Sequence, residues 1–169
     1  MNKRLFSLLL FCLVCPLTQR TTLAEVQTVD FGDRSSPTLT AKAWAAFNAK
    51  KYDDAIVFAN ACIKSFEKRA VEMQASLKEP VDSSDKDAVS SKGALNDVGT
   101  CYFIMGKAFE VQGKNAEAVK AYQQLIKKVS FAQCWDPQGW FWMPAGLAAK
   151  EIKRLEALPP QTTANSGQR

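Results

Sequence analysis

Residues 101–126, CYFIMGKAFEVQGKNAEAVKAYQQLI, decide the fold of this 169-residue chain. Their first half carries apolar or small side chains at i, i+3, i+4 and i+7: Tyr102, Met105, Gly106 and Phe109. Gly113 interrupts this pattern, and a second stripe follows: Ala118, Tyr122, Leu125 and Ile126. Such spacing places each set on one face of a helix, and glycine favours a turn between them. The stretch therefore predicts two amphipathic helices joined as an αα-hairpin.

Small side chains stand where the two predicted helices would cross. Gly106 and Ala118 let the helix axes approach closely, while aromatic residues fill the space on either side. With its large, small, aromatic and alanine positions in this order, the stretch resembles the tetratricopeptide repeat, a helical hairpin of about 34 residues. The resemblance covers one repeat. It implies a protein-interaction scaffold rather than an enzyme, and it leaves the partner open.

A weaker copy of the pattern precedes the strong one. Residues 50–56, KKYDDAI, repeat its turn and helix start, and aligning Ala55 with Ala118 puts Ala43 where Gly106 stands. The small residue at the helix crossing is thus retained. The second helix of this copy carries its own stripe at i, i+4, i+7, i+8 and i+11: Ala55, Ala59, Cys62, Ile63 and Phe66. We expect a degenerate first hairpin here.

The remaining segments complete one all-α domain, with two hairpins and a C-terminal capping helix. We expect a leader at 25–37, a hairpin at 38–78, a polar insertion at 79–92, a hairpin at 93–129, a tryptophan-rich loop at 130–144, a capping helix at 145–157 and a disordered tail at 158–169. A last helix of this kind covers the apolar end of a short repeat array. A calcium-binding loop is suggested by the acidic residues Asp82, Asp85 and Asp87, but their spacing does not fit an EF-hand.

The N-terminus has the pattern of a secretory signal peptide. Lys3 and Arg4 precede an apolar run at 5–17, and small residues offer a cleavage site at Ala24. We therefore expect an exported protein, periplasmic or secreted, with no transmembrane segment in the mature chain. Two alternatives fit less well: a retained anchor, because the run is short for a span, and lipidation at Cys15, because the preceding residue is larger than usual.

The net charge argues against a nucleic-acid partner. Cleavage at Ala24 would remove three basic residues and no acidic one, and would lower the formal net charge from +5 to +2. The sequence contains no basic block with interleaved aromatic residues. A strong positive charge and such a basic block are both typical of proteins that bind nucleic acid. We therefore expect no nucleic acid among the partners.

The absence of histidine excludes several classes of active site. The chain has none, which rules out histidine-based zinc sites and Ser-His-Asp or Cys-His catalysis. Neither a P-loop, a dinucleotide fingerprint nor a nucleophile elbow occurs. Carboxylates such as Asp97 and Glu110 remain for glycoside hydrolysis, but a short helical array offers no deep cleft to raise one pKa. We expect no enzyme, no cofactor and no metal site.

Three cysteines belong to the predicted mature chain. In an oxidising compartment one pair would form a disulfide and leave one thiol free. Cys62 lies on the apolar stripe of a predicted helix and is best explained as a small buried hydrophobic residue. Cys101 at a helix start and Cys134 in a loop are therefore the pair we choose for a disulfide.

The resemblance implies a concave groove formed by the first helices of successive hairpins. Seven side chains flank the core stripe and would line this groove: Thr40, Trp44, Phe47, Asn48, Phe103, Lys107 and Glu110. Trp44 and Phe47 would supply apolar anchors, and Lys107 a charge for a carboxylate or carbonyl of a protein or peptide partner. In the competing interpretation, the leader covers Trp44 and Phe47 and makes them core.

The tryptophan-rich loop leaves two interpretations open. Exposed tryptophans stack on sugar faces, so Trp135, Trp140 and Trp142 suggest an alternative function as a carbohydrate-binding or cell-wall-binding accessory module. We favour a plug, in which the rings fill the gap between the second hairpin and the capping helix. Trp142→Ala would then cost about 3 to 5 kcal/mol. The predicted function is an exported protein–protein interaction scaffold or adaptor.

Overall fold

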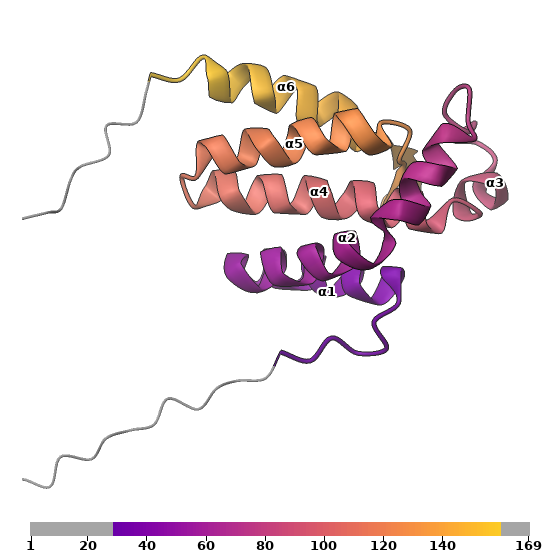
Figure 1. Ribbon diagram of the computed structural model, residues 1–169, viewed down its shortest axis with the longest axis horizontal. Helices are drawn as coiled ribbons and strands as arrows, with labels where there is room; N and C mark the ends of the chain where they lie inside the picture. The colour runs from indigo at the N-terminus through magenta and orange to yellow at the C-terminus, as the bar shows by residue number, and fades with distance from the viewer. Residues whose placement is uncertain (1–28, 160–169) are drawn as a thin grey trace, which may run out of the picture.

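The computed structural model describes residues 29–159, so the predicted signal peptide and most of the predicted tail lie outside the described residues. The elements in chain order are α1 (Ser36–Asn48), α2 (Tyr52–Ala75), α3 (Lys86–Ser90), α4 (Gly93–Val111), α5 (Asn115–Val129), β1 (Cys134–Asp136), β2 (Trp140–Trp142) and α6 (Pro144–Glu156). Figure 1 shows α4, α5 and α6 stacked as one layer after another, with α1 and α2 beside α4. The all-α fold predicted from the sequence is confirmed.

The first hairpin consists of α1 and α2. Ser35 caps α1 by accepting a hydrogen bond from the Thr38 backbone N–H, and Pro37 occupies the first turn, where its missing N–H costs nothing. Lys50 closes the turn to α2 with φ of 60°. In the preceding leader, Phe31 packs edge-on against Phe58 of α2 at 5.7 Å between ring centroids. The described part of the leader therefore packs on α2.

The second hairpin, α4 and α5, turns at Gly113 with φ of +73°. A Cβ built on Gly106 would lie 2.3 Å from Cε1 of Tyr122, which is fully buried. Gly99 has the same role near the other end of α4, where a Cβ would lie 2.2 Å from Cβ of Ala132. The close approach of α4 and α5 predicted at Gly106 is thus a contact between the Tyr122 ring and the backbone of Gly106.

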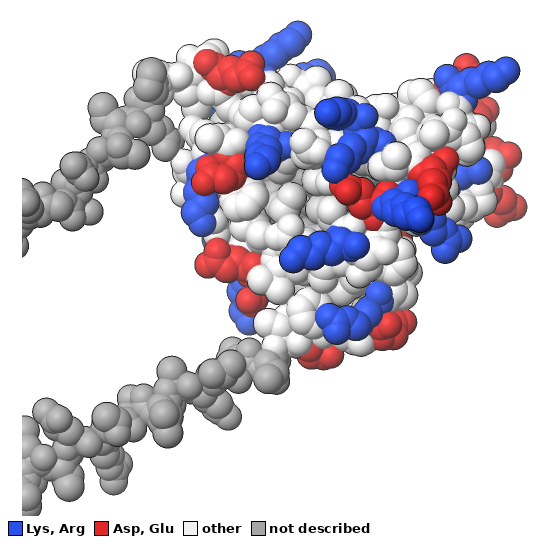
Figure 2. All heavy atoms as spheres, in the orientation of Figure 1, with Lys and Arg blue, Asp and Glu red and all other residues white. Residues whose placement is uncertain are grey.

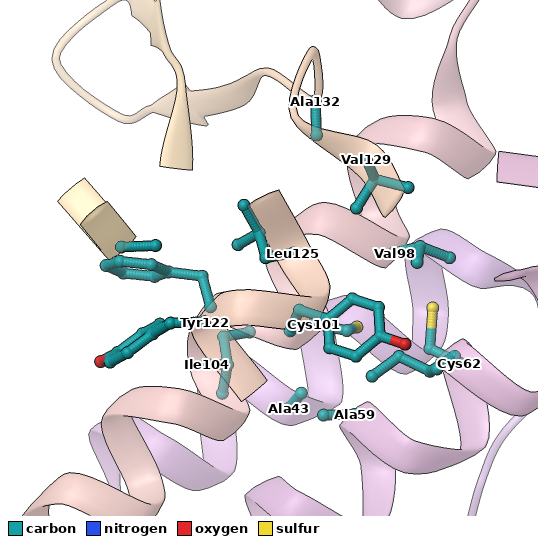
Figure 3. Packing of buried hydrophobic residues seen from close by; sticks show 14 of the residues in the cluster. Ala43, Ala59, Cys62, Val98, Cys101, Ile104, Tyr122, Leu125, Val129 and Ala132 are labelled. Atoms are coloured by element: carbon teal, nitrogen blue, oxygen red, sulfur yellow. The ribbon is translucent and has the colours of Figure 1, made fainter. Parts of the chain in front are cut away.

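The core is built from small and aliphatic side chains shared by the two hairpins. Figure 3 shows Ala43 and Ala59 of the first hairpin close to Cys101 and Ile104 of the second. Because alanines and glycines occupy the crossings, the helices pack closely, and the buried rings of Tyr102 and Tyr122 fill the core beside these crossings. Measured against the length and hydropathy that a bilayer span requires, no helix within residues 29–159 qualifies.

Two segments differ from the sequence-based expectation of loops. The polar insertion contains the short helix α3, whose Val89 is fully buried. Asn96 of α4 fixes this segment by donating a hydrogen bond to the Val89 carbonyl at 2.9 Å, and its side-chain oxygen accepts one from the Gln133 backbone N–H. The tryptophan-rich segment forms an antiparallel hairpin, β1–β2, with Cys134 opposite Trp142. Side-chain hydrogen bonds thus order segments whose sequence indicates turns.

Helix α6 is held on α4 and α5 by a network of charges. Glu110 of α4 forms an ion pair with Arg154 of α6 at 2.5 Å and accepts a hydrogen bond from the Tyr122 hydroxyl of α5 at 3.2 Å. Arg154 also donates to Glu151 at 2.7 Å, and Lys107 lies 3.6 Å from the same carboxylate. The network joins three helices, since each charged group has partners on at least two elements.

We expect part of the α6 contribution to stability to disappear in acid. The hydrogen bond from Arg154 lowers the pKa of Glu151 below its usual 4.5, and burial only partly opposes this. The stabilisation is therefore fully present above pH 4.5 and is lost as the pH falls through the lower folded-state pKa. Because these side chains are partly exposed, Glu151→Gln should cost at most about 1 kcal/mol at pH 7. Urea unfolding should show this cost shrinking at pH 3, whereas an equal cost at both pH values would contradict the prediction.

Candidate functional site

A groove of about 720 Å³ runs between α1, α4 and the β1–β2 hairpin. Its volume lies within the range of roughly 300 to 1,000 Å³ that is typical of ligand-binding clefts. Six of the lining side chains come from three elements: Ser36, Thr40 and Trp44 on α1, Asp97 on α4, and Trp135 and Phe141 on the hairpin. The groove therefore combines the first helices of both hairpins with an aromatic wall from the C-terminal part of the domain.

Asp97 is the acidic group of this groove. Its Oδ2 accepts a hydrogen bond from the Ser36 hydroxyl at 2.6 Å. No described residue donates a hydrogen bond to Oδ1, and none places a cation within 4.0 Å of the carboxylate. Burial raises the pKa of Asp97 and the Ser36 hydrogen bond opposes this only in part. Part of this carboxylate is desolvated, therefore, without a compensating positive charge.

The aromatic wall follows from the alternation of side chains along the short strands. Trp135 lies opposite Phe141, and their rings pack edge-on at 5.0 Å between centroids. Both side chains line the groove, while Trp142 lies on the opposite face of the hairpin and packs against the core. Trp135 remains 48% exposed. A large apolar surface is thus available in the same groove as Asp97.

The predicted groove residues of α1 divide into two pairs. Thr40 and Trp44 line the groove. Phe47 instead packs edge-on against Tyr52 at 5.5 Å, and Asn48 is exposed at the end of α1 and does not line the groove. The described part of the leader, residues 29–37, packs on α2 instead, where Phe31 meets Phe58.

The predicted groove residues of α4 lie elsewhere, which corrects the assignment by alignment. Phe103 is only 8% exposed and packs against Trp142 at 5.2 Å and Tyr122 at 6.0 Å. Lys107 and Glu110 pair with charges of α6. The capping helix and the hairpin cover this part of α4, because α6 packs against the second hairpin as the first helix of a further repeat would. The charge proposed for Lys107 is therefore used within the protein.

The structure does not contain the predicted Cys101–Cys134 disulfide. Both thiols are free and buried, and each approaches a different hydroxyl: Cys101 Sγ lies 3.3 Å from Thr40 Oγ1, and Cys134 Sγ lies 2.8 Å from Thr100 Oγ1. Burial raises the pKa of Cys134 to about 12, so this thiol is neutral in the groove. Cys62, also buried, lies 3.7 Å from the same hydroxyl oxygen of Thr40.

The plug interpretation holds for one tryptophan and is wrong for two. Trp142 packs on Phe103 and against the core cluster, although it stays partly exposed. Trp135 and Trp140 are 48% and 50% exposed and do not fill the gap below α6. Trp142→Ala should therefore cost less than the figure expected for a fully buried ring.

Asp97 is the site residue that the sequence reasoning did not place in the groove. A signal for it exists, because small and polar residues recur at i, i+3, i+4 and i+7 along the start of α4: Gly93, Asn96, Asp97 and Thr100. A polar stripe on an otherwise apolar helix indicates a face turned away from the core. Within residues 29–159, no cluster of three or more acidic or thiol side chains is arranged to hold a metal ion.

Comparison with known proteins bears on the second hairpin. Residues 100–130 match a family model described as tetratricopeptide repeat. No curated protein and no solved structure is similar enough to the chain to count as a match. The matched residues cover most of α4, the Gly113 turn and all of α5. The match and the geometry of α4 and α5 together identify residues 100–130 as a tetratricopeptide repeat.

Proposed function

We propose that the protein is an exported scaffold that binds a segment of a partner protein in the groove between α1, α4 and the β1–β2 hairpin. Tetratricopeptide repeats generally mediate protein–protein interaction and are typically not catalytic. The observation that carries the proposal is the groove itself, which is lined both by the carboxylate of Asp97, without a cationic partner among the described residues, and by the half-exposed ring of Trp135. Aromatic anchors next to a desolvated charge are the features that dominate affinity at protein interfaces.

Export rests on the N-terminal sequence pattern, which lies outside the described residues. The apolar run behind Lys3 and Arg4, followed by small residues up to Ala24, supports it. Protein recovered from the source cells should begin at Glu25 when its N-terminal peptide is measured by mass spectrometry. An intact N-terminus on the mature pool would argue against export by this route.

The geometry of the hairpin favours the groove over a sugar-binding face. Trp135 and Trp140 lie on opposite faces of β1–β2, because Trp135 pairs with Phe141 and Trp140 with Asp136. The two exposed tryptophans therefore do not form one sugar-stacking surface, and Trp142, which shares a face with Trp140, packs on the core. The carbohydrate-binding alternative thus has support only from single exposed rings.

Site-specific photo-crosslinking tests the proposed groove. A photoreactive residue at Ala41, which is exposed and lines the groove, should capture a partner in extract of the source cells. The matched control carries the same residue at Lys64, which is exposed on α2 and does not line the groove. Trp44→Ala in the Ala41 variant should reduce the crosslink to the same protein. Equal capture from both positions, or capture indifferent to Trp44→Ala, would count against the groove.

A further inference from the structure

We infer that the partner segment presents a basic side chain, arginine or lysine, which pairs with Asp97 while its apolar neighbours pack on Trp44 and Trp135. This inference rests on the proposed function, because it names the chemistry of the segment that occupies the same groove. It commits to a protein segment with a positive charge at one position. Anionic segments and uncharged sugars are the occupants that it excludes.

Charge complementarity carries the inference. Asp97 accepts the Ser36 hydrogen bond with Oδ2, and no described residue donates to its Oδ1. Oδ1 can therefore accept a further hydrogen bond from a ligand in the groove. The remaining described side chains that line the groove are uncharged, including the buried Cys134 thiol. A cation entering the groove would therefore find an anion without a competing internal partner, and the pair would be charge-assisted.

The Asp97 carboxylate has a cost for the folded state. A partly buried acid without a cation destabilises the folded state at neutral pH, because its ionised form is disfavoured by burial. An asparagine of nearly the same shape could still accept the Ser36 hydrogen bond without that cost. An amide at position 97 would therefore serve the fold as well as the acid does. A cationic ligand would give the negative charge of the acid a role.

The aromatic wall suits a long basic side chain. Lys86 of α3 already places its Nζ 5.2 Å from the centroid of the Trp135 ring, so this ring accepts a cation at its face. Lys86 is exposed at the rim, and Asp97 lies deeper, at the Ser36 end of α1. The methylene groups of an arginine or lysine would pack on apolar surface while its charged end reaches the carboxylate. Lys86 at the rim would have to move aside for a cation that stacks on Trp135.

A library of random nine-residue peptides displayed on phage, selected on the purified protein, tests the inference. We expect the selected peptides to share one basic position flanked by apolar residues. Synthetic copies of these peptides should bind at least tenfold more weakly to Asp97→Asn, as the loss of a charge-assisted bond implies. Glu156→Gln is the matched control, because it removes one negative charge from the exposed end of α6 and should leave affinity unchanged.

A structural explanation of any loss is tested by the melting temperature. Asp97→Asn should melt at an equal or higher temperature than the parent at pH 7, since it removes a desolvated charge. Replacing the basic position of the peptide by glutamine should weaken binding to the parent as much as Asp97→Asn does. It should then weaken binding to Asp97→Asn no further, because both changes remove the same pair.

The failures of the two proposals can be told apart. In one outcome, the selected peptides bind more weakly to Trp44→Ala but share no basic position, and their affinity is unchanged by Asp97→Asn. That outcome would overturn the charge pairing and leave the groove intact. If no selected peptide depends on Trp44, or if only cell-wall glycan is retained, both the pairing and the proposed function are wrong. A melting temperature for Asp97→Asn well below that of the parent would assign Asp97 to the fold and overturn the inference as well.

Discussion

Gly106→Val is expected to lower the free energy of unfolding by at least about 3 kcal/mol, the upper end of what overpacking usually costs. Even the first added carbon would lie 2.3 Å from Cε1 and 2.6 Å from Cδ1 of Tyr122, well inside contact distance. The ring cannot simply swing away, because it is fully buried and Phe103 packs against it at 6.0 Å. The helices α4 and α5 must separate instead, which opens the core of the repeat.

A second glycine provides the control for this substitution. Gly146 lies inside α6, and a Cβ built on it meets no heavy atom within 4 Å. Gly146→Ala should therefore leave the fold intact and raise stability by about 0.5 to 1 kcal/mol through helix propensity. Urea unfolding followed by circular dichroism at 222 nm compares the two. A Gly106→Val protein that unfolds at the parental urea concentration would show that the close crossing of α4 and α5 is not required.

The helical frame was predictable because its signals are local and repeated. A 3.6-residue period with small residues at the crossings indicates which faces meet, and Gly106 with Tyr122 realises that contact. The β1–β2 hairpin was not predictable in the same way. Its strands have three residues each and owe their position to contacts such as Trp142 with Phe103, far apart in the sequence. A period cannot be read from segments this short.

The candidate site was only half predictable, for a reason that lies in repeat number. Alignment to a repeat indicates which side chains flank the core, but the next element decides which of them stay open. On α1 the flanking Thr40 and Trp44 line the groove. On α4 the flanking Lys107 and Glu110 pair with charges of α6, and the open face lies about three turns earlier, at Asp97. The repeat pattern alone does not indicate which flanking side chains the next element covers.

Tyr122→Ala is expected to cost about 3 to 5 kcal/mol, the range for deleting a fully buried aromatic ring. Tyr122 is the largest fully buried side chain among the described residues, and its ring fills the space that Gly106 leaves open. Its hydroxyl also lies 3.2 Å from Glu110, at the centre of the charges that hold α6. The truncation therefore creates a cavity in the repeat and weakens the cap at the same time.

Tyr122→Phe separates these two effects, because it keeps the ring and removes only the hydroxyl. It should cost about 1 kcal/mol, the net value of one hydrogen bond. The double variant Gly106→Val/Tyr122→Ala gives the sharper test. Its loss of unfolding free energy should be much smaller than the sum of the losses of the two single variants, since the truncated side chain no longer clashes with the valine. Urea unfolding of the four proteins measures the coupling. Strict additivity would mean that the ring and the glycine do not act as one contact, and that the packing of Tyr122 on Gly106 is not what holds α4 and α5 together.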